Sequence, residues 1–279
     1  MERDWRGAVG AAVFTAMWFL AALLMQVVAI GAWALTWEVA AGEAWVDVAL
    51  RELEGVVDGG TLPPVLVVVS LGIQFPVMLA LVEVARQVSM RLPGPAWEEG
   101  WREAYALRAS PPLVSLLAAT LGLTTGWLPG WLAEQLKGVS LLPQLDAVGM
   151  VNAALTTGPF GARVVVMTAV VLGAPVVEEL VFRGALWTLL ARALGPVETW
   201  VATSLLFAAY HMDPVQAVAL VFTALVLGWV RLVTGSVWPG MALHAVNNGL
   251  GVLGALWGPS DLEAELAPAL GMAAVSVAL

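Results

Sequence analysis

The chain has 279 residues, of which 60% are hydrophobic and only 12% are charged. Soluble domains carry about 25% charged residues, so this composition excludes an ordinary soluble domain and predicts an integral membrane protein. The net charge of −9 argues against nucleic acid as a partner, because phosphate binding needs a basic face. The absence of cysteine excludes disulfides, thiolate metal ligands and cysteine nucleophiles.

Apolar runs recur along the whole chain, and about 20 apolar residues are enough to cross a bilayer as a helix. We predict one all-α membrane domain covering residues 1–279, a transmembrane bundle with spans at about 8–35, 62–85, 109–130, 164–191, 197–212, 214–232 and 237–257. Trp37 to Val57 has helical spacing of apolar and acidic residues, which predicts an amphipathic helix on the membrane surface. Arg86 to Arg108 is predicted to be a loop with a short helix. Trp131 to Phe160 is predicted to be a second long connection, broken by proline and glycine.

The loop arginines predict the orientation, because Lys and Arg gather on the cytoplasmic side. With a cytoplasmic N-terminus, the residues inside are Arg3, Arg6, Arg86, Arg91, Arg102, Arg108, Arg192 and Arg231. Those outside are then Arg51, Lys137 and Arg163. The richness in Ala, Val, Gly and Trp indicates a GC-rich bacterium, so the expected location is the inner (cytoplasmic) membrane.

The fourth predicted span contains two adjacent carboxylates, Glu178 and Glu179, and an arginine, Arg183. Each ionisable residue in a span costs roughly 2.5–3.5 kcal/mol on insertion scales, which makes it a candidate functional residue. Glu179 and Arg183 are four residues apart on one helix face, where they can form an ion pair. Glu178 points away from that pair, and a desolvated carboxylate suits a general base. The structural alternative, a salt bridge between helices, leaves Glu178 unexplained.

Both histidines of the chain lie in apolar segments. His211 follows Phe207 by four residues near the end of the fifth span, and His244 precedes Asn248 by four residues in the seventh. Taken alone, each could be a satisfied core residue, and Asn248 could hold two helices together. However, Glu178 and His211 each lie about 20 Å along their helices from the same membrane boundary. We therefore expect the three segments to present their polar groups at comparable depth, as a catalytic cluster requires.

In chain order, the patterns Glu178-Glu179-x-x-x-Arg183, Phe207-x-x-x-His211 and His244-x-x-x-Asn248 resemble the CPBP family, the CAAX-type proteases and bacteriocin-processing enzymes also called the ABI family. The resemblance covers about residues 164–257, which would form the catalytic core. It implies an all-helical bundle that hydrolyses peptide bonds in a cavity within the membrane.

The same resemblance implies a role for each motif residue. Glu178 would activate a water with help from His211, while Glu179, Arg183 and Phe207 would support the site. His244 and Asn248 would donate hydrogen bonds to the tetrahedral oxyanion. We prefer this mechanism without a cofactor. Zinc held by Glu178, His211 and His244 is the alternative.

Family members cleave prenylated C-termini, process peptides, confer bacteriocin immunity or sort C-terminal membrane tails. For a GC-rich bacterium we expect a membrane-associated protein or peptide as substrate, with a C-terminal anchor as one form. Two readings from other classes stay open at this point: a transporter or channel that uses the intramembrane charges, and a non-catalytic immunity or scaffold protein.

Overall fold

The computed structural model describes residues 4–41, 64–93, 100–136, 147–211 and 214–257. Within these ranges all regular structure is helical. The helices are α1 (Arg6–Ala41), α3 (Pro64–Arg91), α4 (Trp101–Ala104), α5 (Pro112–Thr125), α6 (Trp127–Leu136), α7 (Ala147–Thr157), α8 (Phe160–Thr168), η1 (Ala169–Gly173), α9 (Ala174–Glu178), η2 (Glu179–Leu186), α10 (Trp187–Ala193), α11 (Pro196–Tyr210), α12 (Pro214–Thr234) and α13 (Trp238–Trp257). The predicted all-α class is confirmed.

Four stretches of the described chain are long and apolar enough to cross a membrane: Val67–Arg91, Pro112–Pro129, Phe160–Ala193 and Gln216–Thr234. Arg6–Ala22 is a shorter apolar stretch within α1. The predicted spans at 197–212 and 237–257 are helical, as α11 and α13, but are not among the four. α11 is short, with 15 residues, and the histidine and asparagines of α13 lower its hydropathy. The chain is an integral membrane protein.

The connections between spans are more helical than the sequence predicted. The loop expected to begin at Arg86 begins later, because α3 continues to Arg91, although the expected short helix is present as α4. The connection expected between Trp131 and Phe160 contains the end of α6 and all of α7. Helix propensity in these stretches outweighs the local proline and glycine signals. The predicted surface helix at 37–57 begins within α1, and the rest of it lies outside the described residues.

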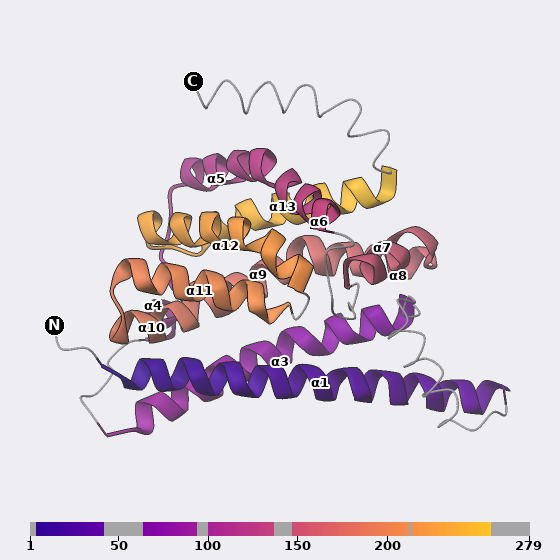
Figure 1. The fold of residues 1–279 in the computed structure, drawn as a ribbon, viewed down its shortest axis with the longest axis horizontal. Helices are drawn as coiled ribbons and strands as arrows, with labels where there is room; N and C mark the ends of the chain where they lie inside the picture. The colour runs from indigo at the N-terminus through magenta and orange to yellow at the C-terminus, as the bar shows by residue number, and fades with distance from the viewer. Residues whose placement is uncertain (1–3, 42–63, 94–99, 137–146, 212–213, 258–279) are drawn as a thin grey trace.

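The bundle is layered, with the motif-bearing helices inside (Figure 1). The long antiparallel pair α1 and α3 forms one edge, and α5 packs against α13 at the opposite edge. Helices α9, α11 and α12 lie between these edges. Close approach of α1 depends on two glycines: a Cβ on Gly7 would be 1.8 Å from the Leu189 carbonyl oxygen, and one on Gly10 would be 2.0 Å from the Ser89 hydroxyl.

The contact between α5 and α13 also depends on small residues. A Cβ on Gly122 would be 2.7 Å from the carbonyl oxygen of Leu243, and one on Gly126 would be 2.8 Å from the Leu250 side chain. These glycines are four residues apart and face α13, which is the spacing that lets helix backbones approach in a membrane. This packing fixes the position of α13, which carries His244 and Asn248.

The stretch from Phe160 to Ala193 is one continuous helical rod with two π-helical segments, η1 and η2. A π-turn shifts the hydrogen bonding from i+4 to i+5, and such turns often occur at functional sites. Each π segment has a carbonyl that accepts from another helix: Asn248 Nδ2 donates to Val170 at 2.9 Å, and Arg231 Nε donates to Arg183 at 2.8 Å. The rod is thus tied to both α12 and α13.

Candidate active site

The predicted pairing of Glu179 with Arg183 is confirmed. Arg183 Nη1 donates to Glu179 Oε1 at 2.8 Å, and both side chains are fully buried. Arg183 Nη2 also donates to the Ala224 carbonyl oxygen of α12 at 3.0 Å, and its guanidinium lies 4.4 Å from the centre of the Phe207 ring. Phe207, which the sequence predicted as a supporting residue, therefore packs against the Arg183 guanidinium, and α12 accepts a hydrogen bond from Arg183. Both contacts offset the cost of burying the arginine charge.

Glu179 fits closely against the start of α13. Its Oε2 is buried without a hydrogen-bond partner. A Cβ on Gly240 would be 2.7 Å from this oxygen, so only a residue without a side chain leaves the carboxylate its space. Gly240 was not among the residues predicted from the motifs, because its role depends on a contact between helices.

His244 lies between the two adjacent carboxylates. Its Nε2 is 3.7 Å from Glu178 Oε2, and its Nδ1 is 3.4 Å from Glu179 Oε1. All three side chains are buried. These distances are longer than direct hydrogen bonds, so the imidazole is held near both carboxylates without being committed to either. The structure thus joins the first and third sequence motifs.

His211 directly follows the last residue of α11 and joins this cluster through Phe207. Its ring centre is 5.0 Å from that of Phe207, and the ring centre of His244 is 5.8 Å from the same phenyl group. His211 Nδ1 is 2.9 Å from the Phe207 carbonyl oxygen. Because a carbonyl can only accept, Nδ1 carries the hydrogen and the neutral ring keeps Nε2 as an acceptor. His211 therefore has the tautomer that can take a proton from a water.

Asn248 lies one turn beyond His244 on α13. Its amide donates to the Val170 carbonyl oxygen of η1, so one of its two hydrogens is committed there and the other is available. Its neighbour Asn247 is buried between α13 and α5, where the Thr125 hydroxyl donates to it at 3.5 Å. The two amides therefore have different surroundings: Asn247 contacts the α5 seam, and Asn248 contacts the π-helical rod.

Two residues that the motifs did not identify also reach the cluster. The Tyr210 hydroxyl lies close enough to the Glu178 carboxyl to interact with it electrostatically, and it accepts a hydrogen bond from Gln74 Nε2. Gln74 is the amide side chain within the predicted apolar span 62–85, which forms part of α3, and polar residues in spans are candidate functional residues. The sequence could therefore have identified Gln74 as a candidate. Its contact with Tyr210 on α11 could not be predicted from spacing.

The zinc alternative can be compared with the donor geometry. In the part of the chain that the structure describes, no group of three or more His, Cys, Asp or Glu side chains is placed to hold a metal ion. Glu178, His211 and His244 therefore do not form a ready three-ligand set here. We derive no step through a metal, and the choice between the two mechanisms stays a prediction.

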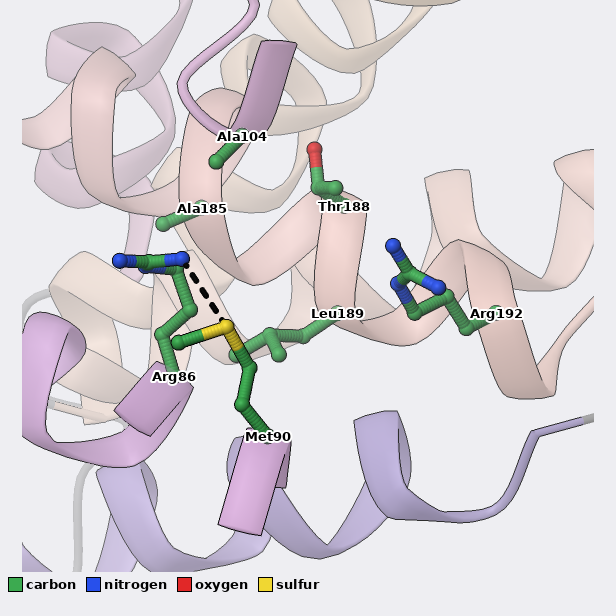
Figure 2. A pocket seen from close by; sticks show the side chains of 7 residues that line it. All are labelled: Arg86, Met90, Ala104, Ala185, Thr188, Leu189 and Arg192. Atoms are coloured by element: carbon green, nitrogen blue, oxygen red, sulfur yellow. Dashed lines mark hydrogen bonds between the residues drawn. The ribbon is translucent and has the colours of Figure 1, made fainter. Parts of the chain in front are cut away.

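A separate hollow lies between the end of α3 and helix α10 (Figure 2). It is lined by Arg86, Met90, Ala104, Ala185, Thr188, Leu189 and Arg192. None of the motif residues lines it. Arg86 is held in place there by Glu83, whose carboxylate accepts from its Nε and Nη2, while its Nη1 contacts the Met90 sulfur. The hollow marks an arginine-lined end of the bundle.

Fold and site together define an all-α membrane protein with a buried cluster of carboxylates, histidines and an arginine. In the comparison with protein families, residues 160–250 match the family described as type II CAAX prenyl endopeptidase Rce1-like. The matched segment runs from the start of α8 into α13 and contains all three motifs. The predicted resemblance is confirmed for this segment, and the family is one of proteases. In the comparisons with curated proteins and with solved structures, nothing matches.

Proposed function

We propose that this protein is an intramembrane endopeptidase in which Glu178 activates a water. The observation that carries this proposal is the convergence of the three motifs: His244 of α13 lies 3.7 Å from Glu178, and Phe207 contacts both histidine rings. A structural role alone explains Glu179 and Arg183, which pair with each other. It does not explain why His244 lies beside Glu178 or why the rings of both histidines pack against Phe207.

In the proposed reaction, Glu178 and His211 Nε2 face a water, and one of them takes its proton as the oxygen attacks the peptide carbonyl carbon. The carbonyl π bond opens to an oxyanion, which receives hydrogen bonds from His244 and from the free amide hydrogen of Asn248. The C–N bond then breaks as the proton passes to the leaving nitrogen. The products are a carboxylic acid and an amine, and one water is consumed.

The substrate we propose is a membrane-associated protein or peptide, of which a C-terminal anchor is one form. The match to a CAAX endopeptidase family makes a prenylated C-terminus the second probe to test. Purified protein in liposomes should be given two internally quenched peptides, one with an apolar membrane-spanning tail and one with a farnesylated Cys-aliphatic-aliphatic-X end. The reaction is run in ¹⁸O-water, because hydrolysis places the label in the new C-terminus.

We expect ¹⁸O-labelled cleavage of the tail peptide by the native protein and none by Glu178→Gln. If only the farnesylated peptide is cleaved, the endopeptidase proposal stands, but the proposed substrate is wrong and a prenylated C-terminus replaces it. If neither peptide is cut in a manner that depends on Glu178, the endopeptidase proposal is wrong. A transporter or a non-catalytic partner-binding protein would give that result.

We propose that no metal is needed for the reaction. Chelation followed by desalting should then leave turnover within about twofold of the untreated enzyme, and elemental analysis should find far less than one zinc per chain. Near one zinc per active chain, with activity lost on removal and restored by added zinc, would overturn this choice. In that case zinc would lower the pKa of a bound water to about 7.

We also propose that the arginine-lined end is cytoplasmic, with the N-terminus on the same side, in a bacterial inner membrane. Asp4 near the N-terminus donates its backbone N–H to the Arg192 carbonyl oxygen, and Arg6 Nη1 donates to Leu92 after α3, so these segments share one end of the bundle. Since the chain has no cysteine, Ala193→Cys gives a single labelling site. An impermeant maleimide should label it in inverted vesicles and not in intact spheroplasts; the reverse result would invert the proposed orientation.

A further inference from the structure

A second set of polar groups lies beside Glu178. The amide of Gln74 on α3 donates to the hydroxyl of Tyr210 on α11, and this hydroxyl lies close enough to the Glu178 carboxyl on α9 for the two groups to interact electrostatically. Tyr210 and Glu178 are 5% and 6% exposed, so water competes little for these contacts. The reaction proposed above assigns no role to either Gln74 or Tyr210.

The chemistry of the three groups fixes which of them donates. An ionised carboxylate can only accept hydrogen bonds, so the Tyr210 hydroxyl must use its single hydrogen toward Glu178. The tyrosine oxygen is then left as an acceptor, and it receives the Gln74 amide N–H. Gln74 thus donates to Tyr210, and the Tyr210 hydroxyl is oriented to donate to Glu178. Hydrogen bonds to a charged group such as the Glu178 carboxylate are the strongest ones.

The aromatic ring of Tyr210 is held in place by its neighbours. Its centre is 4.8 Å from that of Trp18 on α1 and 5.3 Å from that of Phe182 on η2. Three separate elements, α1, α3 and η2, therefore fix where the hydroxyl points. A hydroxyl with so little freedom can select one orientation of the carboxylate that it contacts.

We propose that Gln74 and Tyr210 are positioning residues that hold Glu178 in the orientation that activates water. The inference rests on the proposed function for its catalytic meaning, but the contact itself can be tested without any substrate. In this proposal Tyr210 acts on the carboxylate that activates water and contacts no substrate, so its effect should fall on the chemical step rather than on substrate binding.

The contact is testable by ¹⁹F NMR, because the chain contains only two tyrosines. Protein labelled with 3-fluorotyrosine should give two resonances, assigned with Tyr105→Phe. The Tyr105 hydroxyl donates to Glu83 at 3.3 Å, which makes it a matched internal control. We expect Glu178→Gln and Gln74→Leu to move the Tyr210 resonance by more than its linewidth and to leave that of Tyr105 in place. Glu83→Gln should do the opposite. An unmoved Tyr210 resonance in Glu178→Gln would overturn the relay.

The positioning role is testable by kinetics with whichever peptide the native enzyme cleaves. Tyr210→Phe should lower kcat by about 10–100-fold, the value of a hydrogen bond to a charged group, with KM within about twofold. Gln74→Leu should have a smaller effect in the same direction. Because Gln74 acts through Tyr210, the double variant should be no slower than Tyr210→Phe alone. Tyr105→Phe should keep the native kcat.

The outcomes separate the two proposals. If the native enzyme cleaves and Tyr210→Phe keeps its full kcat, the positioning role is wrong while the endopeptidase stands. Multiplicative effects of the two substitutions would also contradict a relay, since they indicate independent contributions. If the native protein cleaves neither peptide, the endopeptidase proposal is wrong, and Gln74 and Tyr210 then have no catalytic role. The NMR result would still report whether Tyr210 contacts Glu178.

Discussion

Glu178 and Glu179 are adjacent in sequence, yet they belong to two regions of the site with different construction. Around Glu179 the region is closed: Arg183 forms a 2.8 Å ion pair with it, α12 accepts from Arg183, and Gly240 leaves only the space that the carboxylate fills. Around Glu178 the region is looser: His244 is 3.7 Å away, and the hydroxyl of Tyr210 is another polar neighbour.

The difference between the two regions teaches how a membrane protein can keep a reactive carboxylate. A buried charge must be compensated by its neighbours. A carboxylate held in a full ion pair is compensated, but it is then no longer available to take a proton. Here Glu179 takes the arginine, while Glu178 has neighbours that can exchange protons or hydrogen bonds. The two regions should therefore respond to substitution in opposite ways, one in activity and the other in stability.

The largest effect is expected for Glu178→Gln. The amide keeps the shape of the side chain but cannot take a proton, so cleavage should fall by about 10⁴-fold, the upper end for a general base. The unfolding midpoint in detergent should stay near that of the native protein. Loss of folded protein equal to that of a Glu179 variant would contradict the distinction between the two regions.

Glu179→Ala should act on stability instead. It leaves Arg183 buried without a counter-charge, which costs about 3–5 kcal/mol when one partner of a buried pair is removed. The free energy of unfolding measured in detergent checks this. As a control, adding Arg183→Met should recover much of the loss, because the remaining charge is then gone. A double variant as unstable as Glu179→Ala alone would show that the ion pair is not the reason.

The two adjacent asparagines extend the comparison along α13. Asn248→Ala should lower kcat by about 10²–10³-fold, as expected for removal of an oxyanion donor. Asn247→Ala should cost about 1 kcal/mol of stability through the α5 seam and leave kcat within a few-fold of native. Steady-state kinetics of the two variants on one peptide decides, and equal kcat losses would refute the assignment of Asn248 alone to the oxyanion.

A smaller loss of stability than that of Glu179→Ala is expected for Gly240→Ala, which tests how tightly the Glu179 region is closed. The added Cβ would be 2.7 Å from Glu179 Oε2, and such overpacking costs about 1–3 kcal/mol. Gly251→Ala is the matched control on the same helix, because nothing lies within 4 Å of its Cβ position. It should be neutral or stabilising, since alanine favours a helix. Equal unfolding midpoints for the two variants would mean that the carboxylate has more room than the structure shows.

The amino-acid sequence determined the membrane class, the helical segments and the pairing of Glu179 with Arg183. Hydropathy is a property of consecutive residues, and an i,i+4 contact is local to one helix, so neither needs knowledge of the partner helices. The three motifs likewise predicted the protease family that residues 160–250 match.

Only the tertiary structure decided which helices face one another and how closely. The placement of His244 between both glutamates depends on the approach of α13, which the glycines of α5 and Gly240 permit. The link from Gln74 to Tyr210 joins residues 136 positions apart. The π-helical turns also changed the geometry of the rod that carries the glutamates. Such contacts arise when separate helices pack, and spacing along one helix carries no information about them.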